Sequence, residues 1–228
     1  LPTTPTFLRM LMIDSEININ RLNSLKIVTY GAEIMDEDTL IRLNKFLPNI
    51  ICKQTYGMSE ISILRVKSES NNSLWIKIDG NGVEKKIKNK VLYIRSKTKM
   101  FGYLNYESPF DENGWYNTND LVEEKENFIK IVGRTNNVIS VGGIKVLPSE
   151  IERIACSHPY VKNAKASGVK NPITGQHIEI ICEPKKKIDK NIFKEKLRNH
   201  FNSNLDSAIR PLKIIVEEVE ISHRYKKK

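Results

Sequence analysis

Cysteine is scarce in this 228-residue sequence, which contains only Cys52, Cys156 and Cys182. Their odd number and scattered positions do not match a metal site or a disulfide framework, and they indicate reduced thiols in a cytoplasmic protein. No apolar run reaches the roughly 20 residues that cross a bilayer as a helix, so a membrane span is not expected. An initiator Met and a signal peptide are also lacking, and Leu1-Pro2-Thr3 is typical of the interior of a protein, so we expect a fragment.

Lysine, in contrast, is abundant. The chain has 37 Lys and Arg against 27 Asp and Glu, a net charge of +10. Such a surplus indicates either an anionic partner, such as nucleic acid or lipid, or simply a Lys-rich genome. Heavy use of Ile, Asn and Lys throughout favours the genome explanation. Because Arg and aromatic residues are not interleaved and no nucleic-acid fold signature is present, we do not expect nucleic-acid binding.

The first 72 residues alternate between helix and strand patterns. Leu25 to Tyr30 and Ile50 to Gln54 have the apolar character of buried strands. Between them, Asp36 is a candidate N-cap for a helix that Pro48 ends, and Pro5 to Met12 predicts an earlier helix. Strand, helix and strand in succession predict a parallel sheet, whose ligands bind at the carboxyl ends of the strands.

From residue 74 the pattern changes to short strands. Trp75 to Ile78 and Val83 to Ile87 flank the sequence Asp-Gly-Asn-Gly, which predicts a hairpin between them. Val91 to Arg95 predicts a further strand. We therefore expect a small antiparallel barrel or sheet after the parallel one.

The stretch Ile131 to Glu152 predicts a change of structural unit. A strand ends at Gly133-Arg134, a polar turn follows, and Gly142-Gly143 suits a tight hairpin turn that needs positive φ. Ser149 and Glu152 have capping-box spacing at the start of a helix. This pattern is typical either of a hinge between domains or of an ordinary loop, hairpin and helix within one domain.

The remaining chain predicts a small α+β unit. Asp189 is a candidate N-cap for a helix whose apolar face is expected in the core. The expected strands are Val161 to Val169, His177 to Cys182, Ile214 to Val216 and Val219 to Ile221, and the expected apolar face of the helix is Phe193, Leu197, Phe201 and Leu205.

Four motifs then carry a resemblance to a known family. They are YGAE at 30–33, QTYGMSE at 54–60, the segment FGYLNYESPFDENGWYNTNDLV at 101–122, and GRTNNVISVGGIKVLPSEIE at 133–152. In this order they resemble the adenylate-forming enzymes, which include acyl- and aryl-CoA synthetases and the adenylation domains of peptide synthetases. The resemblance covers nearly the whole chain and corresponds to the C-terminal half of such an enzyme.

The resemblance implies an α/β fold in two domains. Residues 1–134 would be the end of a large adenylation domain, with an α/β part at 1–72 containing a remnant of the parallel sheet. The β-rich part at 73–134 would be a small antiparallel β-barrel subdomain. Residues 135–228 would be a mobile α+β C-terminal domain. The family's phosphate loop resembles no stretch of this chain, so we expect the chain alone to be inactive.

The resemblance also implies a nucleotide site in the first domain. Gly31 and Ala32 would lie along the adenine, and Tyr56 would stack on it. Gly57 would allow close backbone approach, Ser59 would meet phosphate, and Glu60 would hold Mg²⁺, for which a carboxylate oxygen is a suitable ligand. Without the resemblance, this stretch is a plain turn with a core tyrosine.

Further roles follow in the second half. Asp120 would accept both ribose hydroxyls, and Arg134 would also contact ribose. Asn136 would be the hinge, where the family often has Asp, and Lys145 would reach phosphate, where many members have Arg. Lys226 aligns best with the catalytic lysine. Asn119 stands in place of the family's Gly before Asp120, and Asn tolerates the positive φ of that turn.

Two of these assignments have plain alternatives. Asp120 could instead be an exposed turn residue, and Lys226 could belong to a solvated basic tail, in which Tyr225 replaces the family's Gly.

The implied function is ATP-dependent activation of a small carboxylic acid (fatty, aryl or amino acid). The acyl-adenylate would then pass its acyl group to the thiol of coenzyme A or of a carrier-protein phosphopantetheine. The alternative is a non-catalytic, regulatory nucleotide-binding module, which the departures at Asn119, Asn136 and Tyr225 motivate. A basic nucleic-acid binder is the third alternative, which salt-dependent binding to random DNA would test.

Overall fold

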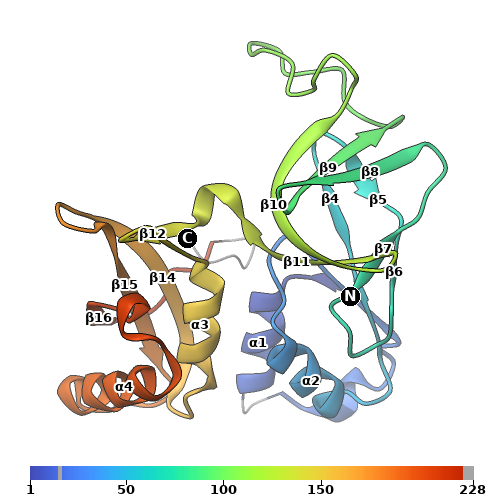
Figure 1. Ribbon diagram of the computed structural model, residues 1–228. Helices are drawn as coiled ribbons and strands as arrows, with labels where there is room; N and C mark the ends of the chain where they lie inside the picture. The colour runs from blue at the N-terminus through green and yellow to red at the C-terminus, as the bar shows by residue number, and fades with distance from the viewer. Residues whose placement is uncertain (15–16, 223–228) are drawn as a thin grey trace. The chain divides into compact units, whose positions relative to one another are not determined.

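The computed structural model describes residues 1–14 and 17–222, and its mixed α/β architecture agrees with the predicted class. The chain divides into two compact units, Leu1–Thr135 and Asn136–Lys228. The first unit contains two clusters of buried hydrophobic residues and the second unit contains one, and the units are described separately (Figure 1). No helix in the described part of the chain is long and apolar enough to cross a bilayer.

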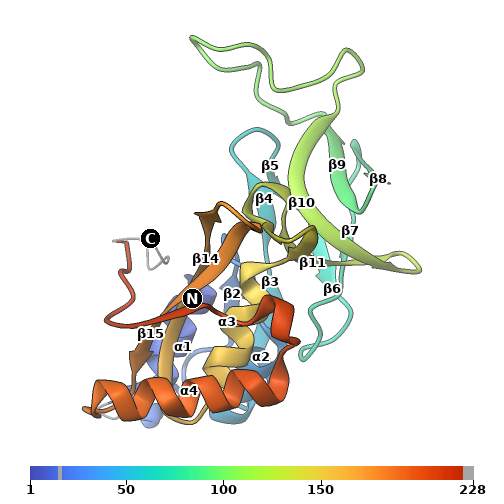
Figure 2. The same cartoon turned by 60° about the vertical axis from the view of Figure 1, so that its left-hand side comes forward.

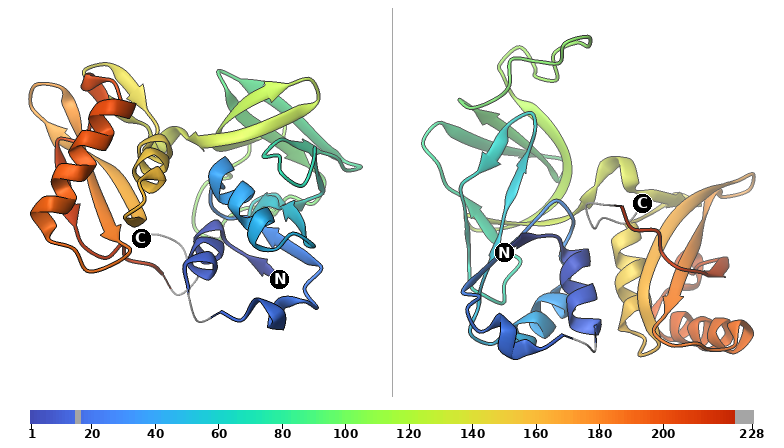
Figure 3. Two further views of the ribbon diagram at one scale, coloured as in Figure 1. Left: turned by 90° about the horizontal axis from the view of Figure 1, so that it is seen from below. Right: turned by 180° about the vertical axis from the view of Figure 1, so that it is seen from behind.

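A small parallel sheet forms the start of the first unit, as predicted. Its order is β1 (Pro2–Thr3), β2 (Ile27–Tyr30) and β3 (Ile51–Gln54), and β2 pairs with β3 from Ile27↔Ile51 to Tyr30↔Gln54. The helices α1 (Pro5–Ile13) and α2 (Glu37–Phe46) pack their apolar residues against one face of this sheet (Figure 3). The short 3₁₀ helix η1 (Ile19–Leu22) lies between β1 and β2 in the chain. The predicted cap is confirmed, because the Asp36 side chain accepts from the Thr39 N–H at 2.8 Å.

The segment after β3 differs from the expected loop. Tyr56 to Met58 is a strand, β4, which pairs antiparallel with β5 (Ser62–Leu64) in a hairpin. Gly57 explains the close pairing, because a Cβ on it would lie 2.5 Å from the carbonyl oxygen of Ser62. The motif QTYGMSE therefore continues into a two-stranded ribbon.

A curved six-stranded antiparallel sheet completes the first unit (Figures 1 and 2). Its order is β6-β7-β11-β10-β9-β8, with β6 at Val66–Ser68, β7 at Ile76–Ile78, β8 at Val83–Lys88, β9 at Val91–Ser96, β10 at Tyr116–Lys125 and β11 at Phe128–Arg134. Between β9 and β10, residues 97–115 form a long loop that extends away from the sheet.

The predicted hairpin between residues 75–78 and 83–87 is wrong. Strand β7 pairs with β6 and β11, whereas β8 pairs with β9 at the far edge of the sheet. The Asp79 N–H bonds to the Arg65 carbonyl, beside β6, and Gly82 takes φ 82°. The turn residues were recognised, but a turn signal does not specify which strand the next strand pairs with.

The second unit is a sheet covered on one face by α3 (Pro148–Ser157) and α4 (Lys190–Asn204) (Figures 2 and 3). After the 3₁₀ turn η2 (Thr135–Asn137), the strands are β12 (Ile139–Val141), β13 (Ile144–Val146), β14 (Val161–Asn171), β15 (Gly175–Pro184) and β16 (Lys213–Val216), with a further 3₁₀ turn η3 at Ser207–Ile209. The β12–β13 turn confirms the expected positive φ, at 56° for Gly142 and 89° for Gly143.

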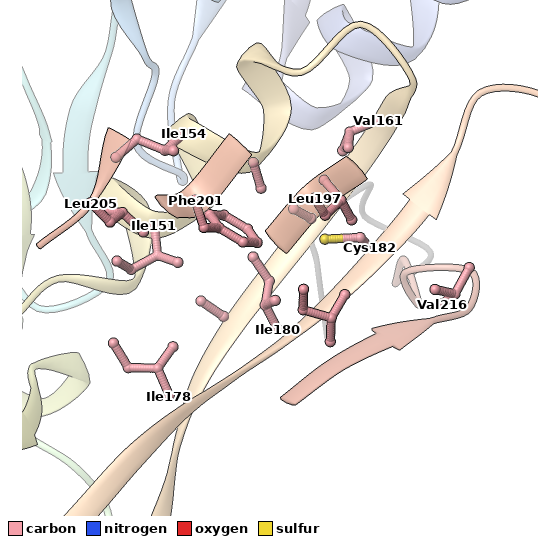
Figure 4. Close-up of a cluster of buried hydrophobic side chains, with 14 of the residues drawn as sticks. Ile151, Ile154, Val161, Ile178, Ile180, Cys182, Leu197, Phe201, Leu205 and Val216 are labelled. Carbon is pink, nitrogen blue, oxygen red and sulfur yellow. The ribbon is translucent and has the colours of Figure 1, made fainter. Parts of the chain in front are cut away.

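The core of the second unit lies between the helices and the sheet (Figure 4). As predicted, Asp189 caps α4, and the apolar face of that helix is buried. The α4 residues Phe193, Leu197 and Phe201 pack with Ile180 and Cys182 of β15.

Two predictions for the second unit are wrong. Ser149 is not the N-cap, because α3 begins at Pro148 with Leu147 as its N-cap, and the Glu152 carboxylate accepts from the Ala166 N–H of β14 at 3.0 Å. Proline suits the first helical position, so it moves the start of the helix ahead of Ser149. The strand expected at Val219–Ile221 is also absent, and Ile221 makes only a single bridge.

Candidate nucleotide-binding site

The centre of the candidate site is the carboxylate of Asp120. Asp120 lies on β10 directly opposite Arg134 of β11, and Tyr56 approaches from β4. The Tyr56 hydroxyl donates to Oδ2 at 2.7 Å, and the Arg134 Nε donates to Oδ1 at 2.8 Å. Asp120 is only 4% exposed, so these donors stabilise a charge that is largely removed from water. The exposed-turn interpretation of Asp120 is therefore wrong.

The turn before Asp120 depends on two residues. Asn119 takes φ 57°, which confirms that Asn supplies the positive φ expected there. The Thr118 hydroxyl donates to the Leu92 carbonyl at 2.8 Å and accepts from the Asp120 N–H at 3.1 Å. The strand register shifts at this point, and the shift orients the carboxylate of Asp120. Thr118 was not among the residues predicted from the sequence, although a hydroxyl residue two positions before a carboxylate is a common local hydrogen-bond signal.

The protonation of Tyr56 follows from this geometry. Burial, and then the charge of Asp120, raise the pKa of Tyr56 well above its usual range. Its hydroxyl therefore keeps its proton and acts as a donor to Asp120. At 6% exposure, little of its ring faces solvent, and its hydrogen bond to Asp120 was not foreseen.

The Glu60 carboxylate lies near the hydroxyl groups of Tyr103 and Tyr116 and near the charge of Arg134. It accepts a hydrogen bond from the Tyr103 hydroxyl of the long loop. Burial alone would raise the pKa of Glu60, but hydrogen bonds from Tyr103 and Tyr116 and the charge of Arg134 together lower it. Burial and the charge of Glu60 raise the pKa of Tyr116 to about 12. Glu60 is therefore ionised at neutral pH, whereas both phenols remain hydrogen-bond donors.

The donor set at Glu60 decides whether a metal fits. No group of three or more His, Cys, Asp or Glu side chains that could hold a metal occurs among the described residues. Mg²⁺ does not need such a group, since it commonly takes one or two carboxylates together with substrate phosphates and water. A single ionised and partly exposed carboxylate fits that requirement when phosphates supply the other ligands.

Gly31 and Ala32 follow β2 at the carboxyl edge of the parallel sheet. A Cβ on Gly31 would lie 2.2 Å from the Thr55 Oγ1, and Ala32 takes φ 65°. The Thr55 hydroxyl in turn donates to the Tyr30 carbonyl at 3.1 Å. The YGAE and QTYGMSE motifs therefore pack against each other at the strand ends, where the parallel-sheet argument expected them.

The remaining predicted residues have simpler surroundings. Ser59 is exposed in the turn between β4 and β5. Lys145 is exposed on β13 of the second unit, and its Nζ donates to the Ser140 hydroxyl at 2.9 Å. Asn136 lies in η2 and is the first residue of the second unit. Lys226 and Tyr225 lie outside the described residues.

Comparison with known proteins identifies relatives along the chain. Residues 150–224 match the family model of the AMP-binding enzyme C-terminal domain. A phenylacetyl-CoA ligase (epaB) of Aspergillus niger is 30% identical over 172 residues, which is 66% of this chain and 32% of the relative. A 4-coumarate–CoA ligase of rice is 27% identical over 77% of this chain and 36% of the relative.

Solved structures share the fold. An ATP-bound RpMatB-BxBclM chimera superposes with a TM-score of 0.81 at 19% identity, over 99% of this chain and 48% of that one. An anthranilate CoA ligase in complex with anthranoyl-AMP gives a TM-score of 0.80 at 16% identity, over 99% of this chain and 47% of that one.

The motifs and these relatives agree with the resemblance to the adenylate-forming enzymes, and the solved structures share the fold. Residues 150–224 match the AMP-binding enzyme C-terminal domain, and the curated relatives described above are named as CoA ligases. The chain spans about a third of the length of those relatives, at 32% and 36%.

Proposed function

We propose that the full-length protein activates a carboxylic acid with ATP, forming an acyl-adenylate and pyrophosphate. It then transfers the acyl group to the thiol of coenzyme A or of a carrier-protein phosphopantetheine. Fatty, aryl and amino acids are the candidate substrate classes. The relatives named as CoA ligases support this proposal, and a 30% identical relative from Mycobacterium marinum is named as a fatty acid–[acyl-carrier-protein] ligase.

The observation that carries the proposal is the carboxylate of Asp120. An ionised carboxylate has about four acceptor sites, two on each oxygen. Tyr56 and Arg134 each occupy one, on different oxygens. One acceptor site is therefore left on each oxygen, which is the arrangement that two neighbouring ribose hydroxyls need. The fixed donors hold the carboxylate in one orientation before the nucleotide arrives.

Glu60 is the residue we propose to hold Mg²⁺, which when bound neutralises charge on the phosphate oxygens during transfer. The phenols of Tyr103 and Tyr116 and the cation Arg134 keep this carboxylate ionised. Lys145 is proposed to reach phosphate, Lys226 to act as the catalytic lysine, and Ser59 to donate to phosphate. Gly31, Ala32, Tyr56 and Gly57 are proposed to form the adenine side of the site.

The alternative, a non-catalytic nucleotide-binding module, rested on three departures from the family pattern. One of them no longer weighs against an active site, because Asn119 takes the left-handed conformation that the family's Gly would supply. The second departure, Asn136, lies at the expected hinge. The third, Tyr225, lies near the C-terminal end of the sequence.

The test is pyrophosphate exchange by the full-length protein with panels of fatty, aryl and amino acids. We expect exchange with at least one class. In that protein Glu60→Gln is expected to slow the Mg²⁺-dependent exchange about 10-fold or more while ATP binding is largely kept. Glu69→Gln is the matched control, because Glu69 is an exposed carboxylate that pairs with Lys125 and not with the phenols around Glu60.

Nucleotide binding without exchange for any acid would replace the proposal with the non-catalytic module. If Glu60→Gln and Glu69→Gln slowed pyrophosphate exchange equally, Glu60 would not be the residue that holds Mg²⁺.

A further inference from the structure

The positive charge of the chain is concentrated in the second unit. Residues 136–228 contain 18 Lys and Arg against 10 Asp and Glu, a surplus of eight out of the net +10 of the whole chain. The first unit is nearly balanced, with 19 against 17. A genome-wide preference for lysine would raise both units alike, so it does not explain this asymmetry.

Part of that charge forms a defined patch of five side chains, here called the basic patch: His158, Tyr160, Lys185, Lys196 and His200. The Lys196 Nζ lies 5.4 Å from the centre of the Tyr160 ring. The His158 ring lies 5.5 Å from Tyr160 and 5.1 Å, edge-on, from His200. The Lys185 N–H bonds to the Tyr160 carbonyl at 2.9 Å. Residues from the end of α3, the end of β15 and the middle of α4 therefore meet at one place.

The patch lacks compensating negative charge. Lys185 and Lys196 have no ion pair with any carboxylate in the described part of the chain. The pKa of His158 is lowered, first by burial and then by the positive charges of His200, Lys196 and Lys185. The surroundings of His158 are therefore positively charged. Two further exposed lysines, Lys186 and Lys187, follow in the chain.

The patch is not built as a nucleophilic centre. The His200 Nε2 lies 2.8 Å from the Ile154 carbonyl, which can only accept, so this nitrogen carries the proton. It therefore cannot accept a proton from the Ser157 hydroxyl 3.1 Å away. Instead, His200 ties α4 to the end of α3 and fixes the shape of the surface.

We propose that the basic patch docks an acidic protein surface, namely that of the carrier protein that presents the acceptor thiol. This inference rests on the proposed function and selects one of its two thiol sources. Complementary charge steers such encounters and fixes their orientation. The half-exposed Tyr160, whose ring packs beside His158, offers the aromatic contact that protein interfaces favour. A membrane surface would instead need several inserted apolar side chains, and Tyr160 is the only large apolar ring that the patch exposes.

The experiment measures binding of the 228-residue chain to an acidic, phosphopantetheine-loaded acyl carrier protein by titration calorimetry. We expect binding that weakens as salt is raised. The double variant Lys185→Glu with Lys196→Glu is expected to weaken binding about 10-fold or more. The matched control, Lys88→Glu with Lys170→Glu, makes the same charge change at two exposed lysines outside the patch, and we expect a change of less than about threefold. Circular dichroism checks that both variants are folded.

Absence of binding at low salt, or equal weakening in both double variants, would overturn the proposal. Phosphatidylserine vesicles and random-sequence DNA are tested in parallel. Patch-dependent binding of either one without binding of the carrier protein would also overturn the proposal and assign the patch to that class.

The full-length protein separates this inference from the proposed function. The patch variant is expected to leave pyrophosphate exchange and transfer to coenzyme A unchanged, and to raise the KM for the carrier protein. Absence of exchange in the unsubstituted protein contradicts the proposed function, whereas normal exchange with no effect of the patch on transfer contradicts this inference alone.

Discussion

At the scale of single residues, the site depends on how a buried carboxylate is kept charged. The side chain of Asp120 is 5% exposed, whereas that of Arg134 is 50% exposed. A carboxylate removed from water to this extent is stable only when donors replace its hydration. Tyr56 supplies the buried donor and Arg134 supplies the charge at the surface, so loss of either leaves Asp120 incompletely satisfied.

The contribution of Tyr56 is testable in the chain itself. Tyr56→Phe removes the hydroxyl and leaves the ring, so we expect the free energy of unfolding of the first unit to fall by about 1–3 kcal/mol, the range for a hydrogen bond to a charged group. The measurement is urea unfolding followed by tryptophan fluorescence. Tyr93→Phe is the matched control, since Tyr93 lies on β9 with its ring beside Lys86. A loss as large in the control would mean that the Asp120 bond contributes nothing specific.

Sequence reasoning identified Asp120, Arg134 and Tyr56 individually but did not pair Tyr56 with Asp120. The two residues are 64 positions apart, and their contact depends on the β4–β5 hairpin, which was expected to be a loop. Gly57 was assigned to ligand approach, whereas in the structure its missing Cβ makes room for the Ser62 carbonyl. The Tyr56–Asp120 contact and the strand partner of Gly57 both depend on which segments pack together, and local patterns do not contain that information.

At the scale of elements, the sequence correctly predicted features that a single residue or residue pair determines, such as a helix N-cap or a tight turn. Asp36 and Asp189 cap α2 and α4 through their own side chains, and Gly142-Gly143 makes the β12–β13 turn. The predictions that failed required a choice between competing local signals, as with Pro148 and Ser149, or a choice of partner strand, as with β7 and β8. Periodicity fixes which face of an element is buried, but strand order follows from the whole sheet.

The apolar face of α4 gives the element-scale prediction. Phe201 is 2% exposed in the core of the second unit, so Phe201→Ala is expected to lower the stability of that unit by about 3–5 kcal/mol. Both tryptophans, Trp75 and Trp115, belong to the first unit. In a denaturant titration the helical circular-dichroism signal should therefore shift to lower denaturant while the tryptophan transition stays in place.

The control for this substitution is Asn202→Ala, at an exposed position one residue further along α4. It should leave both transitions within about 0.5 kcal/mol of the unsubstituted chain. If Phe201→Ala moved the tryptophan transition equally, the two units would unfold as one, and their separate cores would not mean separate stability.

At the scale of the whole molecule, the two compact units differ in net charge. The compact units divide after Thr135, one residue from the expected boundary between 134 and 135. When the charges are counted over these two units, eight of the net ten positive charges lie in the C-terminal unit. The pattern at Ile131 to Glu152 left a hinge and an ordinary connection both open, and the boundary at 134/135 was what the resemblance implied. The basic patch needed the structure, because its residues come from three elements.

Asn136 is the first residue after this division, and we propose it as the pivot between two orientations of the C-terminal unit. A pivot must change φ and ψ between the two half-reactions. Proline fixes φ near −65°, within the range of the 3₁₀ turn η2 in which Asn136 lies. Asn136→Pro in the full-length protein is therefore expected to trap one orientation, leaving one half-reaction largely intact and suppressing the other. We expect adenylation to survive.

Asn136→Ala is the matched control, because it removes the amide but keeps the rotation of the backbone, so both half-reactions should continue. The two measurements are pyrophosphate exchange and thioester formation from preformed acyl-adenylate, with circular dichroism to exclude unfolding. Proline also disfavours the helical conformation of the preceding Thr135, so a small loss of stability is expected with the trapping. Equal losses in both half-reactions, in a folded protein, would show that Asn136 is not the pivot. Two unaffected half-reactions would make Ile131 to Glu152 an ordinary connection between two units that need not reorient.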